Sequence, residues 1–105
     1  MTTDMIDGVC VTTKANVYFD GKCISHAITL ADGSRKSVGV VLPAQLTFGT
    51  NAAEVMECVG GSCEYRLADG QQWIRCGTGE RFHVGANARF DLRVSEPFHY
   101  ICHYG

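Results

Sequence analysis

Four histidines are the first residues of this sequence that metal chemistry would need: His26, His83, His99 and His103. Side chains alternate in direction along a strand, so His99 and His103 are predicted to share one strand face. Four residues at ~3.3 Å each put them about 13 Å apart, too far for both to bind one ion. The histidines are therefore expected to be surface or partly buried residues, and no metal centre is predicted.

Six cysteines raise the possibilities of zinc and of disulfides. They stand at positions 10, 23, 58, 63, 76 and 102, with no Cys-x-x-Cys among them. A zinc site needs four convergent ligands, usually in closely spaced pairs, and that spacing is absent. Because the sequence starts without a secretory signal pattern, a reduced state is favoured, in which cysteine packs as a small hydrophobic residue.

Acidic and hydroxyl side chains offer a second kind of chemistry. Glu54 and Glu57 are predicted to lie on opposite faces of one strand, so at most one of them can face an interior cavity. Tyr100, Cys102 and Tyr104 share a face of the last strand, and a buried tyrosine hydroxyl must find a polar partner. This makes Tyr100 the better candidate for contact with a ligand.

Short strands must position these residues. Residues 77–94 contain two alternating runs, at 81–84 and 90–94, joined by a Gly85-Ala86-Asn87 turn. Asp20-Gly21 predicts another turn, and residues 63–67 are expected to pair back across Gly60-Gly61-Ser62. The whole chain is predicted to form about nine or ten short strands and no long helix. The pattern is typical of an all-β barrel or sandwich.

The bulk composition limits the functional classes. The chain has 105 residues, 46% hydrophobic and 19% charged, so one folded domain is expected, with residues 1–14 as a loose leader and 15–105 as the domain. A net charge of −2 with scattered Lys and Arg argues against a nucleic-acid partner or an anionic membrane. No run is long enough to span a membrane, and a cytoplasmic location is expected.

Several segments, taken together in order, resemble the pyrimidine/purine nucleoside phosphorylase family of small cupins. The first are Asn16-Val-Tyr-Phe-Asp-Gly-Lys22, Ser37-Val-Gly-Val-Val-Leu-Pro43 with Thr47-Phe48, and Glu54-Val-Met56 ahead of Gly61. Then follow Trp73, Gly79 with Phe82 and Val84, Ala86-Asn87, Phe90, Leu92 and Tyr100-Ile-Cys-His-Tyr104. No single piece is specific, but the ordered set covers nearly all of residues 16–104.

The resemblance implies a double-stranded β-barrel of the cupin type that acts as a homodimer. It also implies cleavage of the N-glycosidic bond of purine and pyrimidine nucleosides by inorganic phosphate, which yields a free base and a pentose 1-phosphate. Phosphate would be the co-substrate, and no cofactor is expected.

The implied reaction assigns roles to residues. Phosphate needs cations or hydroxyls beside C1′ of the sugar, and we choose Arg35 with Ser37, with Lys22 as second choice. An oxocarbenium-like transition state is helped by a carboxylate, and Glu54 is our candidate because it lies in the matched Glu-x-Met. Core packing is the more common role of Phe48 and Phe90. The predicted substrate-binding residues are Tyr18, Phe48, Phe90, Tyr100 and Tyr104.

Departures from the family pattern keep other hypotheses open. The family usually has Gly-Glu-Tyr around Ala44-Gln45-Leu46, proline at the position of Gly85 and proline where this chain has Ala53. Loss of a carboxylate at Gln45 could remove a catalytic acid, so one alternative is a non-catalytic cupin that binds a small metabolite in the same cavity. Another alternative, a metal-dependent cupin oxygenase or isomerase, is disfavoured because no histidine stands at Val41, Leu42 or Pro43, where a first metal motif would lie.

Overall fold

The computed structural model describes residues 4–68 and 70–104, and within these ranges the regular secondary structure consists of strands and one short 3-10 turn. The all-β prediction is confirmed. The strands are β1 Cys10–Val11, β2 Asn16–Tyr18, β3 Cys23–Thr29, β4 Arg35–Val41, β5 Ala44–Gly49, β6 Glu54–Gly60, β7 Ser62–Leu67, β8 Ile74–Gly77, β9 Arg81–Val84, β10 Arg89–Val94 and β11 Phe98–Tyr104; the short 3-10 turn η1 covers Phe19–Gly21.

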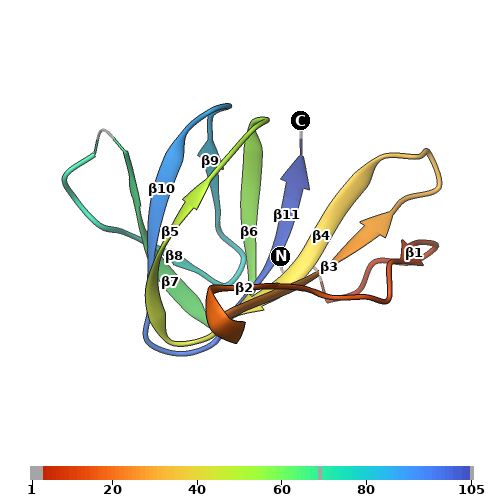
Figure 1. Cartoon of the computed structure of the whole chain (residues 1–105), viewed down its shortest axis with the longest axis horizontal. Coiled ribbons are helices and arrows are strands. Elements are labelled where there is room, and N and C mark those ends of the chain that lie inside the picture. The colour runs from red at the N-terminus through yellow and green to blue at the C-terminus, as the bar shows by residue number, and fades with distance from the viewer. Residues whose placement is uncertain (1–3, 69, 105) are drawn as a thin grey trace.

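Two antiparallel sheets face each other across the core (Figure 1). The large sheet has the order β1-β3-β4-β11-β6-β9, with β2 also paired to β3, and the small sheet has the order β5-β10-β7-β8. Within the described residues no strand pairing joins one sheet to the other. The barrel expected from the sequence is therefore open, a sandwich of two sheets rather than a closed cylinder.

The chain passes repeatedly between the sheets after β4, and this corrects one expected pairing. Residues 63–67 do not pair back on the preceding strand, because β6 pairs with β11 and β9, whereas β7 pairs with β10 and β8. The two runs within residues 77–94 likewise separate, since β9 joins the large sheet and β10 the small sheet. The turns at residues 60–62 and 85–87 are therefore corners between sheets, whereas the predicted Asp20-Gly21 turn joins the antiparallel pair β2 and β3.

Two of these corners depend on left-handed backbone conformations. Asn87, in the corner before β10, has φ of 52°, and Gly61, between β6 and β7, has φ of 69°. A Cβ at Gly61 would also lie 2.1 Å from the carbonyl oxygen of Pro97, so only glycine fits there. The Thr50 side chain fixes the other corner: its hydroxyl donates to the Gly85 carbonyl and accepts from the Ala88 amide.

The core lies between the sheets and is rich in aromatic rings. Phe82 stacks on Tyr65 with ring centroids 4.0 Å apart and meets Phe90 edge-on at 5.8 Å. Five cysteines are buried there as small hydrophobic residues, at positions 23, 58, 63, 76 and 102, whereas Cys10 is exposed. Burial raises the pKa of Cys76 to about 11, which keeps that thiol protonated and unreactive at neutral pH.

The domain boundary at residue 15 stays a prediction. Within the expected leader, Cys10–Val11 forms β1 and pairs with Thr29 and Ile28 of β3 at the edge of the large sheet. No helix in the described part of the chain is long and apolar enough to cross a membrane.

Gly39 in β4 lets the Tyr100 ring lie across the large sheet, which generates a prediction. A Cβ at this position would lie 2.7 Å from both the Tyr100 hydroxyl and the Ile24 carbonyl oxygen. Gly39→Ala is therefore expected to lower the free energy of unfolding by about 1–3 kcal/mol, as measured by urea denaturation. Gly85→Ala is the control: a Cβ there meets nothing within 4 Å, and the change should stay within about 0.5 kcal/mol. Equal stability of both variants and the wild type would contradict the close approach.

Candidate active site

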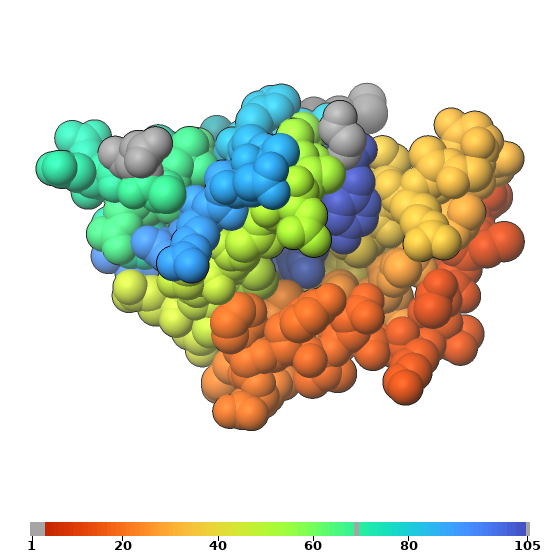
Figure 2. Space-filling view, turned by 45° about the horizontal axis from the view of Figure 1, so that its top comes forward, coloured from red at the N-terminus to blue at the C-terminus, as the bar shows by residue number. Residues whose placement is uncertain are grey.

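A cavity of about 320 Å³ opens between the inner face of the large sheet and the edge of the small sheet. In Figure 2 it appears as a hollow between the orange segment that carries β2 and η1 and the yellow-green segment of β5 and β6, with dark-blue atoms of β11 visible between them. Its size suits one small ligand. The lining side chains are aromatic, hydroxyl, thiol or aliphatic, with a single carboxylate: Tyr18, Phe19, Cys23, Ser25, Ser37, Val41, Thr47, Phe48, Gly49, Glu54, Met56, Phe90, Tyr100, Cys102 and Tyr104.

The carboxylate lies at one end of the cavity among polar partners. Glu54 begins β6 opposite Tyr104 of β11, and the Cys102 thiol donates a hydrogen bond to its carboxylate. Burial raises the pKa of Glu54, and the Cys102 bond offsets part of that rise. The Ser37 and Tyr104 hydroxyls are 2.9 Å apart and hydrogen-bonded, which completes the group. Burial and the neighbouring Glu54 carboxylate raise the pKa of Cys102 to about 12, so Cys102 stays protonated and can donate.

Tyr100 occupies the middle of the cavity. Its hydroxyl lies 3.6 Å from the Cys23 sulfur, and Ser25 is a second hydrogen-bonding partner. Burial, followed by the Cys23 thiol, raises the pKa of Tyr100, so its hydroxyl remains a neutral donor. The expectation that a buried tyrosine hydroxyl here would have polar partners is met.

The other end of the cavity is aromatic. The Phe48 ring stacks on Phe90 at 5.3 Å and meets the Phe19 ring edge-on at 5.1 Å. Phe19 belongs to η1, where Phe19, Asp20 and Gly21 all have positive φ, of 54°, 54° and 89°. A left-handed conformation costs a residue with a Cβ roughly 1–2 kcal/mol.

All the site residues predicted from the sequence line this cavity except Arg35. Arg35 is exposed at the start of β4, two residues before Ser37 and so on the same strand face, but outside the lining. Lys22 is exposed at the end of η1 and is also outside the lining. Within the described residues no lysine or arginine side chain enters the cavity.

Gln45 lies on the solvent side of the small sheet. It is exposed, while its neighbours Leu46 and Phe48 in β5 pack against the core. A carboxylate in its place would also point away from the cavity.

Sequence reasoning missed Phe19, Cys23 and Ser25 as lining residues. Cys23 and Ser25 alternate along β3 with Ile24 and His26, and that period indicates a shared face but not which face is inward. Phe19 lies in a turn, where no periodic signal exists. The sequence correctly placed Cys102 on the same strand face as Tyr100 and Tyr104, but it indicated no functional role for the thiol.

Glu57 lies on the outer face of the large sheet, opposite to Glu54 as predicted. Its carboxylate accepts from His103 Nε2 at 2.8 Å and pairs with Arg81 at 3.0 Å, and Lys36 Nζ donates to His103 Nδ1 at 2.7 Å. These residues connect β4, β11, β6 and β9 on the face away from the cavity. In the part of the chain that the structure describes, no group of three or more His, Cys, Asp or Glu side chains is arranged to hold a metal ion.

Comparison with solved structures identifies the fold. An oxalate decarboxylase variant from Bacillus subtilis superposes with a TM-score of 0.72 at 10% identity and covers 98% of this chain and 30% of that chain. At such low identity the likeness is one of fold alone, and it agrees with the cupin-type architecture predicted from the sequence.

Comparison at higher identity covers nearly the whole chain. A solved structure from an Acinetobacter species, described as a protein of unknown function, has a TM-score of 0.94 at 39% identity and covers 96% of this chain and 98% of that chain. A protein from Ralstonia nicotianae named pyrimidine/purine nucleoside phosphorylase is 70% identical over 104 residues, which cover 99% of both chains. The family model described by the same name matches residues 13–104. This chain therefore belongs to the pyrimidine/purine nucleoside phosphorylase family.

Proposed function

We propose that this protein is a broad-specificity nucleoside phosphorylase, which cleaves purine and pyrimidine nucleosides with inorganic phosphate to a free base and a pentose 1-phosphate. The observation that carries the proposal is a cavity in which one carboxylate stands beside hydroxyl groups and faces an aromatic wall, in a chain of this family. The alternative of a non-catalytic binding protein is not favoured, because the 70% identical relative has the name of the enzyme.

Glu54 is the catalytic residue of this proposal. A phosphate oxygen bonds to C1′ as the glycosidic bond breaks, the bonding electrons go to the base nitrogen, and that nitrogen takes the proton that the phosphate loses. Positive charge develops on the sugar ring in between, and a carboxylate in an apolar cavity stabilises it more strongly than in water. Cys102 acts as a positioning residue, since its thiol donates to that carboxylate.

The hydroxyls beside Glu54 are assigned to the sugar and the phosphate. Ser37 and Tyr104 can exchange their mutual bond for bonds to these groups. Arg35 shares their strand face at the exposed end of β4, and a guanidinium there can hold phosphate at the cavity rim by paired N–H bonds. In this mechanism phosphate is the co-substrate and no further cofactor takes part. We assign the protein to the cytoplasm, a reducing compartment suited to its six free thiols.

Base release is expected to require phosphate. Purified protein is incubated with a panel of purine and pyrimidine nucleosides, with and without phosphate and with a metal chelator present throughout, and free base is quantified. Equal base release without phosphate would make the protein a hydrolase, and loss of turnover with the chelator would contradict the cofactor-free mechanism.

Arg35→Ala should raise KM for phosphate about tenfold or more with little change in KM for the nucleoside, because one charge-assisted phosphate contact is lost.

Glu54→Gln is expected to lower kcat about a hundredfold or more, because the charge facing the transition state is removed. Since burial raises the Glu54 pKa, wild-type kcat should fall on acidification at a higher pH than an ordinary glutamate would cause, and this limb should be absent in the variant. A kcat that rises on acidification would instead make Glu54 a proton donor.

Denaturation curves provide the folding control for Glu54→Gln. A raised folded-state pKa means that ionised Glu54 lowers stability as pH rises through that pKa, so the variant should be at least as stable as wild type at neutral pH, with the advantage disappearing in acid. Glu64→Gln is the matched control. Its pKa is lowered by the hydrogen bond from Arg93, so that variant should lose stability at neutral pH and keep full activity.

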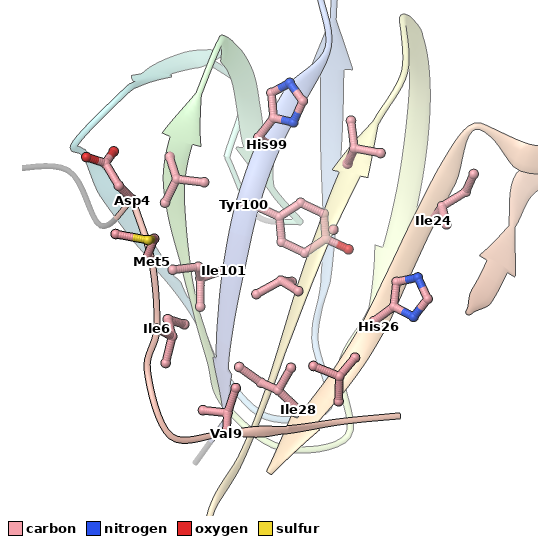
Figure 3. A pocket seen from close by; sticks show the side chains of 15 residues that line it. Asp4, Met5, Ile6, Val9, Ile24, His26, Ile28, His99, Tyr100 and Ile101 are labelled. Carbon is pink, nitrogen blue, oxygen red and sulfur yellow. The ribbon is translucent and has the colours of Figure 1, made fainter. Parts of the chain in front are cut away.

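A homodimer is also proposed, and the outer face of the large sheet supports it. A second hollow, of about 640 Å³, lies there between β3, β4 and β11 and the N-terminal segment (Figure 3). Its lining is mostly aliphatic, and in Figure 3 Met5 and Ile6 lie beside Ile101 of β11, with Ile24 of β3 on the opposite side. An open apolar hollow of this kind is typical of an interface between protein chains.

Light scattering is expected to give twice the 11.4 kDa of one chain. Val38→Glu places a charge in this hollow and should shift the protein towards monomer. Ile74→Glu, at an exposed position in β8 of the small sheet, should not. A monomeric wild type would rule the dimer out.

A further inference from the structure

Phe19 is held in place by a backbone conformation that its residue type disfavours. It is the first of three consecutive left-handed residues in η1, and a bulky side chain at positive φ is a rare exception. Strained conformations of this kind persist only when the surroundings over-determine them, and they cluster at ligand-binding sites. Glycine adopts positive φ without steric cost, as at Gly21 two residues further on, whereas Phe19 adopts it against a steric penalty.

Core burial does not supply that reason. The Phe19 side chain remains 42% exposed, and its ring contacts Phe48 at the cavity wall. A half-exposed apolar ring gains free energy when a ligand covers it, because its remaining surface is then removed from water. The strained turn therefore presents the ring to the cavity rather than to the protein core.

We propose that Phe19 is a base-binding residue, whose ring together with Phe48 forms the wall on which the nucleobase lies. This inference rests on the proposed function and deepens it. Along the row of inward-facing residues, Tyr18 pairs with Cys23 at one end and Glu54 pairs with Tyr104 at the other. A nucleoside fits this polarity with its base towards Phe19 and C1′ towards Glu54.

The same wall accounts for breadth of substrate. The rings of Phe19, Phe48 and Phe90 carry no hydrogen-bonding group that could read a base edge, and every base has a π-face on which such rings pack. One-ring and two-ring bases are therefore accepted alike, because the contact scales with overlap rather than with a donor and acceptor pattern. Discrimination between bases by this part of the cavity is weak.

Phe19→Leu tests the wall, because it removes the ring and keeps an apolar side chain of similar size. KM for purine and pyrimidine nucleosides should both rise about tenfold, with KM for phosphate unchanged and kcat largely retained. Phe19→Tyr keeps the ring and should restore wild-type KM. Val17→Ala, an exposed substitution of the neighbouring strand outside the cavity, should change none of these constants.

Direct binding separates this inference from the proposed function. Calorimetry with a nucleoside in phosphate-free buffer should show the same tenfold loss of affinity in Phe19→Leu, whether or not the protein turns the nucleoside over. Turnover with an unchanged nucleoside KM in Phe19→Leu would overturn the wall and leave the phosphorylase standing. A crystal structure of wild type with a bound nucleoside gives a test that needs no variant: a base against Phe19 supports the proposal, and a base at the Glu54 end overturns it.

Discussion

The cavity depends on the central place of β11 in the large sheet. Because β4 and β6 flank it, both backbone edges of β11 are hydrogen-bonded, and its register is fixed from two sides. That register turns Tyr100, Cys102 and Tyr104 inward and leaves His99 and His103 on the outer face. A slip by one residue would exchange the two sets and fill the cavity with imidazoles. The missing side chain of Gly39 provides the room that the inward row needs.

The polar residues of the cavity are organised before any ligand arrives. Hydrogen bonds join Glu54 to Cys102, Ser37 to Tyr104 and Tyr100 to Cys23, so each group has a partner in surroundings where an unpaired polar atom is costly. Among the described residues no buried side-chain nitrogen or oxygen lacks a hydrogen bond. Donors held in this way need little reorganisation when charge develops on a bound molecule.

The sequence predicts strand faces well and sheet partners poorly. The alternation of side chains correctly predicted that Glu54 and Glu57 lie on opposite faces of one strand and that Tyr100 and Tyr104 share a face. Alternation is a local property of a strand and does not depend on which strands pair with it. Pairing depends on residues far apart in the chain: the Gly61 corner resembles a hairpin turn in sequence, yet it lies against Pro97, and β7 pairs with β10 and β8 of the other sheet. Phe19 was missed for the same reason, since a turn has no period and its contact with Phe48 is long-range.

The ring of Trp73, the one tryptophan of the sequence, contacts two guanidinium groups. The Arg66 and Arg93 guanidinium carbons lie 4.4 and 4.3 Å from its ring, and ion pairs to Asp91 and Glu64 hold both arginines. This cluster lies on the solvent side of the small sheet, and Trp73 is absent from the lining of the cavity. Intrinsic fluorescence therefore reports whether this sheet is intact and how salt affects its ion pairs. A ligand in the cavity would contact Tyr18, Tyr100 or Tyr104 rather than Trp73, so the tryptophan and tyrosine signals distinguish the two sites.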